Sequence, residues 1–199
     1  DVRGTGWMAG PYASLRLSDN VFWQGRGSWG TSSNTINTAG GRDHFDSTRW
    51  LLSSSLTGRW EAGNGLSFEP TGSFTYFEDR SDSYLDSASL LIPGVKTSLG
   101  QLKFSPALSY AFTTDDGLWV QPALATELIW NFASTNIEGM GTLDETAQGP
   151  KGARGRIKAG LKVRTVSGIT FGASGAYDGI GSDGFHSISG NANVDIPLN

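Results

Sequence analysis

The chain has 199 residues and a formal net charge of −4, and 17% of its residues are charged. This weak acidity argues against a dedicated nucleic-acid binder, which needs clustered surface cations. The absence of cysteine excludes a disulfide framework and a thiolate metal site. The 28 glycines, together with 7 Trp, 5 Tyr and 10 Phe residues, favour β-structure with tight turns over helices.

Membrane helices and targeting signals are not evident in the sequence. No apolar run approaches the roughly 18 residues that a membrane helix needs. The first residues, Asp1-Val2-Arg3-Gly4, do not resemble a secretory signal. We therefore expect either a cytosolic protein or a piece of a longer chain, and the pattern of the strands decides between them.

Alternation of apolar and polar residues predicts nine β-strands. Several of them run for about 12 to 16 residues, whereas strands of soluble domains typically have about 5–6. In chain order the strands are expected near residues 5–17, 21–32, 45–60, 66–79, 97–112, 118–131, 153–166, 169–179 and 186–198.

The connections between these strands alternate in length. Short turns rich in Gly, Asn and Asp are expected at 18–20, 61–65, 113–117 and 166–168, and longer loops at roughly 33–44, 80–96, 132–152 and 180–185. Short turns at one end and long loops at the other are typical of an up-and-down antiparallel transmembrane β-barrel of the outer membrane.

Aromatic residues on the apolar faces of the strands form two groups. Trp and Tyr are selected at the two lipid–water interfaces of a barrel, whereas a soluble β-sandwich would collect them at the middle of its core. The distribution favours the membrane barrel over the sandwich. The predicted interface aromatics are Trp7, Trp29, Trp50, Tyr76 and Trp130 toward the long loops, and Trp23, Trp60 and Tyr110 toward the short turns.

Charged residues gather on the opposite faces, most clearly in "ARGRIKAGLKVRTVSG" at 153–168, where every cation occupies an even position. In a barrel this face lines the lumen, because an Arg or Lys at the lipid midplane costs roughly 2–4 kcal/mol. The predicted lumen-lining cations are Arg16, Arg26, Arg49, Arg59, Lys103, Arg154, Arg156, Lys158, Lys162 and Arg164, and the predicted lumen-lining acids are Glu69, Asp79, Glu127, Asp178 and Asp195.

Ten cations against five acids leave an excess of five positive charges in the predicted lumen. One interpretation is a partly paired wall of charges that keeps the lumen hydrated. The other is that an anionic group sits inside. We favour the second, because five cations would stay unpaired even if every acid found a basic neighbour.

No catalytic or metal site is expected. The stretches 26–30 and 172–176 only approach the Gly-x-Ser-x-Gly elbow of serine hydrolases, and no helix follows either of them. His44 and His186 lie beside acidic residues near long loops, but a third catalytic element is missing. The stretch 178–184 lacks the alternating oxygen ligands of a calcium loop. We expect no cofactor.

The chain resembles the C-terminal autotransporter β-domain of Gram-negative bacteria in five stretches: "GTGWMAGPYASLRLSDNVFWQGRGSWG", "STRWLLSSSLTGRW", "ELIWNF", "RGRIKAGLKV" and "AYDGIGSDGFHSISGNANVDIPLN". This resemblance spans essentially the whole chain. It implies a twelve-stranded outer-membrane barrel whose lumen holds a linker helix, and which anchors and helps export an N-terminal passenger domain. It also implies contact with outer-membrane lipid and with the barrel assembly machinery.

Three features depart from the pattern of that family. Nine strands are fewer than twelve, and a barrel of even strand number then lacks three strands at the N-terminus. Residues 1–199 would therefore be a barrel domain without its first strands, linker helix and passenger. The sequence ends Pro197-Leu198-Asn199, whereas such barrels usually end in an aromatic residue that the insertion machinery recognises.

The sequence therefore predicts a non-enzymatic translocator and anchor for protein secretion in the outer membrane. An alternative is a stand-alone small barrel that acts as an anion-preferring pore or an adhesin. A soluble β-sandwich binding module is the third possibility.

Overall fold

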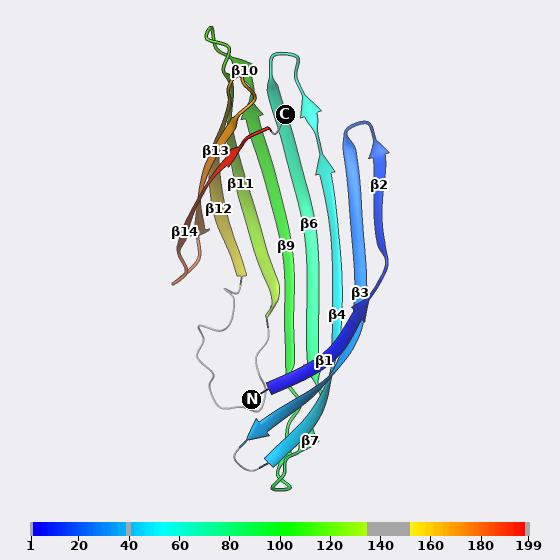
Figure 1. The fold of residues 1–199 in the computed structure, drawn as a ribbon. Coiled ribbons are helices and arrows are strands. Elements are labelled where there is room, and N and C mark those ends of the chain that lie inside the picture. Colours follow the sequence, from blue (N-terminus) through cyan, green and yellow to red (C-terminus); the bar gives the residue numbers. More distant parts are fainter. Residues whose placement is uncertain (1, 39–40, 135–151, 198–199) are drawn as a thin grey trace.

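The computed structural model describes residues 2–38, 41–134 and 152–197. These residues form one large antiparallel sheet and a separate two-stranded hairpin (Figure 1). They contain no helix, and so none with the length and apolar character needed to cross a membrane. The strands are β1 (Val2–Ala9), β2 (Tyr12–Ser18), β3 (Val21–Thr38), β4 (Gly41–Gly58), β5 (Trp60–Glu61), β6 (Leu66–Ser81), β7 (Tyr84–Leu85), β8 (Leu91–Ile92), β9 (Lys96–Tyr110), β10 (Phe112–Thr113), β11 (Trp119–Ser134), β12 (Gly152–Arg164), β13 (Thr170–Ile180) and β14 (Ser187–Asp195).

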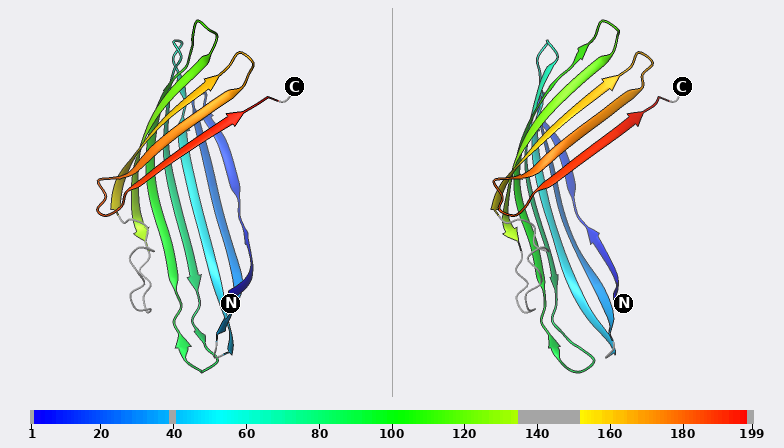
Figure 2. Two further views of the ribbon diagram at one scale, coloured as in Figure 1. Left: turned by 60° about the vertical axis from the view of Figure 1, so that its left-hand side comes forward. Right: turned by 90° about the vertical axis from the view of Figure 1, so that its left-hand side faces the viewer.

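The large sheet is an up-and-down arrangement whose hydrogen-bonded order is β1-β3-β4-β6-β9-β11-β12-β13-β14. Strands β2, β5 and β10 continue β1, β4 and β9 in the same position of the sheet: β2 pairs with β3, β5 with β6 and β10 with β11. We call each such position in the sheet, filled by one strand or by two in succession, a lane. The path therefore contains nine lanes, and the predicted all-β antiparallel sheet of nine long strands is confirmed. Figure 2 shows that the sheet is curved and that its strands twist progressively toward β14.

The first lane consists of β1 and β2, which keep one register against β3, from Val2 opposite Ile36 to Arg16 opposite Phe22. The break between them falls at Gly10 and Pro11. A Cβ on Gly10 would lie 1.8 Å from the carbonyl oxygen of Gly27, so only glycine fits there. Pro11 has no N–H to donate, but its carbonyl accepts a bond from the Gly27 N–H at 3.1 Å.

The connections lie at two ends of the sheet, as predicted, but one long loop was predicted wrongly (Figure 1). Between β3 and β4 the pairing continues to Thr38 opposite Gly41, so most of the expected loop 33–44 is paired strand. The loop near 80–96 contains the β7–β8 hairpin, which the sequence did not predict. Residues 135–151, most of another expected loop, lie outside the described residues, as do Leu198 and Asn199.

The two faces of the sheet differ in burial. The fully buried residues, glycines apart, are Ser28, Ser32, Asp43, Ser47, Glu127, Ile129, Asn131 and Asp178. By the strand registers, all of them lie on the face that carries the predicted lumen residues, which we call the polar face. No second layer covers either face of the described sheet. The polar side chains are therefore buried by crowding against one another on the concave side.

The opposite, apolar face carries exposed large hydrophobic side chains along its whole length. Two rows of aromatic residues cross it. Trp50 and Trp60 lie on one lane ten residues apart, about 33 Å at about 3.3 Å per residue. At the strand tilt usual in barrels, about 40°, this separation gives a band about 25 Å tall, the height of a lipid-facing band. The predicted interface aromatics on this face are Trp7, Trp23, Trp29, Trp50, Trp60, Tyr76, Tyr110 and Trp130.

Neighbouring positions on β11 provide a test of the two faces. Leu124, on the apolar face, lies between Leu108 and Ala159, whereas the exposed Ala123 faces the polar side. We expect Leu124→Arg to destabilise the folded domain by about 2–4 kcal/mol in lipid vesicles, because it places a cation near the lipid midplane. Ala123→Arg should cost much less. Refolding into vesicles across a urea series measures both, and equal losses would contradict the assignment of the faces.

Candidate functional site

The candidate site is the polar face itself. The strand registers place all ten sequence-predicted cations and all five predicted acids on this face. The alternation causes this directly, because residues two apart on a strand project to the same side. Nine lanes in continuous register then bring side chains from all parts of the chain onto one surface.

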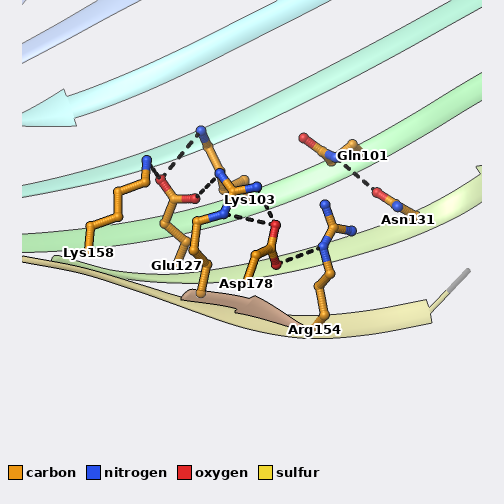
Figure 3. Close-up of polar contacts among 8 residues, drawn as sticks. Gln101, Lys103, Glu127, Asn131, Arg154, Lys158 and Asp178 are labelled. Carbon is orange, nitrogen blue, oxygen red and sulfur yellow. Dashed lines mark hydrogen bonds and ion pairs between the residues drawn. The ribbon is translucent and has the colours of Figure 1, made fainter. Parts of the chain in front are cut away.

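Glu127 on β11 is the most buried carboxylate that takes part in an ion pair. Its side chain is only 3% exposed. One carboxylate oxygen accepts a hydrogen bond from Lys158 Nζ at 2.6 Å and lies 4.0 Å from Lys103 Nζ, and the other accepts from Arg156 Nη1 at 3.1 Å (Figure 3). A single carboxylate thus serves three cations from β9 and β12.

Asp178 on β13 is the second shared carboxylate, and its side chain is 7% exposed. Arg154 Nε donates to its Oδ1 at 3.1 Å, and Arg156 donates to its Oδ2 through both Nε and Nη2. The register shifts between Gly155 and Arg156 of β12, where β13 carries Gly179 with φ of +109°. A Cβ on Gly179 would lie 2.0 Å from a backbone oxygen, so glycine makes this bulge possible.

Arg154 has an unusual environment. Its side chain is 10% exposed, and its Nη1 is buried without a hydrogen-bond partner in the described part of the chain. The guanidinium carbon lies 5.5 Å from the centre of the Phe185 ring. Gln101 and Asn131, also drawn in Figure 3, bond to each other, with Gln101 Nε2 donating to Asn131 Oδ1 at 2.9 Å. Buried guanidinium donors normally have acceptors, so this orphan marks an incomplete site.

More exposed ion pairs are formed by Arg16 on β2, Arg49 on β4 and Arg59, which follows β4. Arg49 Nε lies 2.6 Å from Asp79 Oδ2, and Arg59 Nε lies 2.8 Å from Glu69 Oε2. The Arg16 guanidinium is 3.0 Å from the Asp19 carboxylate in the adjoining turn. Exposed pairs of this kind contribute at most about 1 kcal/mol each. These pairs keep charged groups on the polar face, but they contribute little to the free energy of unfolding.

Three of the ten cations, Arg26, Lys162 and Arg164, form no ion pair within the described residues. Arg26 donates to Ser28 Oγ at 3.2 Å, and the Arg164 guanidinium lies 4.9 Å from the ring centre of Trp119. Asp195 accepts from Asn193 Nδ2 rather than from a cation. The expectation of five unpaired cations was therefore wrong, because Glu127 and Asp178 are shared and Arg16 uses a turn residue. The registers also place two acids that were not predicted, Asp43 and Glu61, on the polar face, so ten cations face seven acids and the excess is three rather than five.

Small side chains form a shallow hollow on the polar face toward the short turns. Cross-strand partners Ser109, Ala123, Gly160 and Ser174 lie in one row across β9, β11, β12 and β13. This row forms the floor, and Arg59, Glu69 and Lys162 are among the other lining residues. Small residues allow another backbone to approach closely.

Sequence reasoning missed the aromatic side chains on the polar face. The Phe22 ring has the Arg16 guanidinium 5.9 Å from its centre and that of Arg59 at 5.8 Å. Phe22, Trp119 and Phe185 thus hold cations by cation–π contacts. The available signal was parity, because Phe22 shares its parity on β3 with Arg26, and Trp119 shares its parity on β11 with Glu127.

The histidines do not join a catalytic constellation in the described residues. His44 Nδ1 lies 3.0 Å from Thr35 Oγ1, and His186 Nδ1 lies 2.9 Å from the Tyr177 hydroxyl. Among residues 2–38, 41–134 and 152–197, no group of three or more His, Asp or Glu side chains could hold a metal ion. The chemistry available on the polar face is electrostatic, namely the binding of an anionic group by an excess of cations.

The shared carboxylate gives a stability prediction. Glu127→Gln leaves Lys103, Arg156 and Lys158 without their common buried counter-ion, so we expect a loss of about 3–5 kcal/mol. Glu69→Gln is the matched control, since its pair with Arg59 is 43% and 56% exposed, and it should cost about 1 kcal/mol or less. The temperature at which the folded band disappears on a gel compares the variants. Equal shifts would refute the central role of Glu127.

The comparisons with known proteins agree with this architecture. The family model described as autotransporter beta-domain matches residues 1–178. The crystal structure of the β domain of the Bordetella autotransporter BrkA is similar, with a TM-score of 0.53 and 18% identity over 97% of this chain and 72% of that one, which supports the fold. A search of curated proteins returned no match. The chain belongs to the autotransporter β-domain family, the outer-membrane translocators of type V secretion.

Proposed function

We propose that this domain anchors a passenger in the Gram-negative outer membrane and assists its export, with the apolar face against lipid and the polar face lining the lumen. The observation that carries the proposal is the complete separation of the predicted charges and the predicted aromatics onto opposite faces of one curved sheet. In this arrangement the domain has no catalytic role. Its insertion would depend on the barrel assembly machinery.

Closure of the barrel requires further strands. The first lane and β14 lie at the two ends of the sheet, and no described strand pairs with their outer edges. An open edge in hydrocarbon leaves backbone groups unsatisfied at a cost of several kcal/mol each, so a spanning sheet must close. Three further strands between these edges would give twelve, an even number as bacterial single-chain barrels have.

The polar face supports a polypeptide as the content of the lumen. Its hollow of small side chains would let a helix approach closely, and the charged residues that line it are Arg59, Lys162, Glu61 and Glu69. The linker that connects barrel and passenger fits this hollow if it is helical, and acidic residues on it would pair with the excess cations elsewhere on the polar face. Lumen contacts would involve Arg16, Arg26, Arg49, Arg59, Arg154, Arg156, Lys158, Lys162 and Arg164.

Lys162 and Arg164 give the sharpest test of the lumen contact. Neither forms an ion pair within the described residues, so their reversal breaks no internal pair. In the full-length protein, Lys162→Glu with Arg164→Glu should lower the amount of surface-exposed passenger several-fold, because acidic groups passing the lumen would meet repulsion. Asp115→Lys with Asp116→Lys, in a short turn, is the control.

Surface protease accessibility of the passenger and heat-modifiability of the barrel are measured together. Unchanged export in a barrel that still assembles would remove the lumen-contact proposal. If the barrel of the double variant no longer assembles, the test is repeated with Lys162→Glu and Arg164→Glu separately, because each single substitution alters the lumen charge less.

The cation excess also favours a second candidate function, an anion-preferring pore. Single-channel recordings of the purified full-length protein distinguish the two. A translocator whose lumen is filled should conduct little, whereas a pore should conduct steadily and prefer chloride over potassium, because cations line its wall.

A further inference from the structure

The ion pairs around Glu127 and Asp178 do not balance. Four cations, Lys103, Arg154, Arg156 and Lys158, contact these two carboxylates, which leaves two positive charges in excess. Both carboxylates are nearly fully buried. Among the four cations Arg154 is the most buried, at 10% exposed against 29–43% for the others, so water screens its positive charge least.

The excess has a defined location at Arg154. Its Nε is satisfied by Asp178, whereas its Nη1 is buried and has no partner among residues 2–38, 41–134 and 152–197. A buried donor without an acceptor costs about 1–3 kcal/mol, and more for a charged group. The neighbouring Phe185 ring offers no lone pair in the ring plane that could accept from it.

A bound oxyanion would give Arg154 Nη1 an acceptor and would also reduce the excess positive charge. A carboxylate can reach Nη1 only if the atoms that bury it move apart, and it would then complete the donor pattern of the guanidinium, whose planar fork matches carboxylate geometry. It would also reduce the excess of cations around Glu127 and Asp178 from two to one. A neutral acceptor would satisfy the donor but not the charge.

We propose that Arg154, supported by Arg156 and Lys103, forms a binding site for one acidic side chain of the polypeptide that occupies the lumen. We call this binding site the seat. This inference rests on the proposed function and specifies its partner as a single Asp or Glu carboxylate. The seat lies on β12 close to the long-loop end, so that carboxylate anchors the segment near the mouth through which a passenger leaves.

A double-mutant cycle in the full-length protein tests the seat. Each Asp and Glu of the segment preceding the barrel is changed to Asn or Gln, with and without Arg154→Gln, and the midpoint of heat-modifiability is measured. One acidic position should lower the midpoint by roughly 5 °C, and this effect should disappear in the Arg154→Gln background. It should persist with Arg80→Gln, a cation on the apolar face.

Sodium acetate tests whether the site at Arg154 binds a carboxylate once the coupled acidic residue has been removed. With the coupled acid removed, sodium acetate should restore the midpoint in the presence of Arg154 but not with Arg154→Gln, and sodium chloride at equal ionic strength should not. Arg154→Lys should respond weakly, since it keeps the charge without the fork.

The outcomes separate the two levels of the proposal. If the protein folds and exports its passenger but no acidic position couples to Arg154, the seat is overturned and the translocator proposal stands. If acetate raises the midpoint of the unaltered protein as strongly as that of the acid-deleted variant, the seat takes solution anions only, which also overturns the inference. If no heat-modifiable barrel forms, the proposed function itself fails.

Discussion

A slip of one residue between two strands of this sheet would exchange their faces. On β12 it would turn Arg156 and Lys158 into the apolar face and Ile157 into the polar one. The continuous register across the lanes prevents this, and it depends on backbone hydrogen bonding along strands of up to 18 residues. The separation of charge from apolar surface, the buried ion pairs and the hollow all depend on that register.

Much of the architecture was predictable because its signal has a period of two. Nine lanes, their antiparallel order and the faces of Trp50 or Arg156 follow from parity alone. The end of β3 was not predictable, because the stretch around Asn34 and Asn37 is polar on both faces. Hydrogen bonding across the lane extends the strand there without any apolar alternation.

The candidate site was predictable as a surface but not as a set of contacts. Parity places Glu127 and Asp178 among cations, yet it does not determine that Arg156 bridges both of them. That bridging follows from the register, which places Arg156 directly opposite both Glu127 and Asp178, and the register needs more than the parity of each strand. The cation–π partners were missed because an aromatic ring on the polar face departs from the alternation of apolar and polar residues. Phe22 is such a case, and its ring contacts two arginines.

A chain with a net charge of −4 thus contains a concave surface that is locally basic. Some of the acids that offset these cations in the total charge lie elsewhere, for example at Asp115 and Asp116 in a short turn. On the concave side, cations close together in a low dielectric repel one another unless an anion joins them. If this face lines the lumen as proposed, an empty lumen is electrostatically less stable than one filled by an acidic segment. The same unbalanced charge that weakens the domain alone would favour the state in which polypeptide occupies it, and so couple assembly to occupancy.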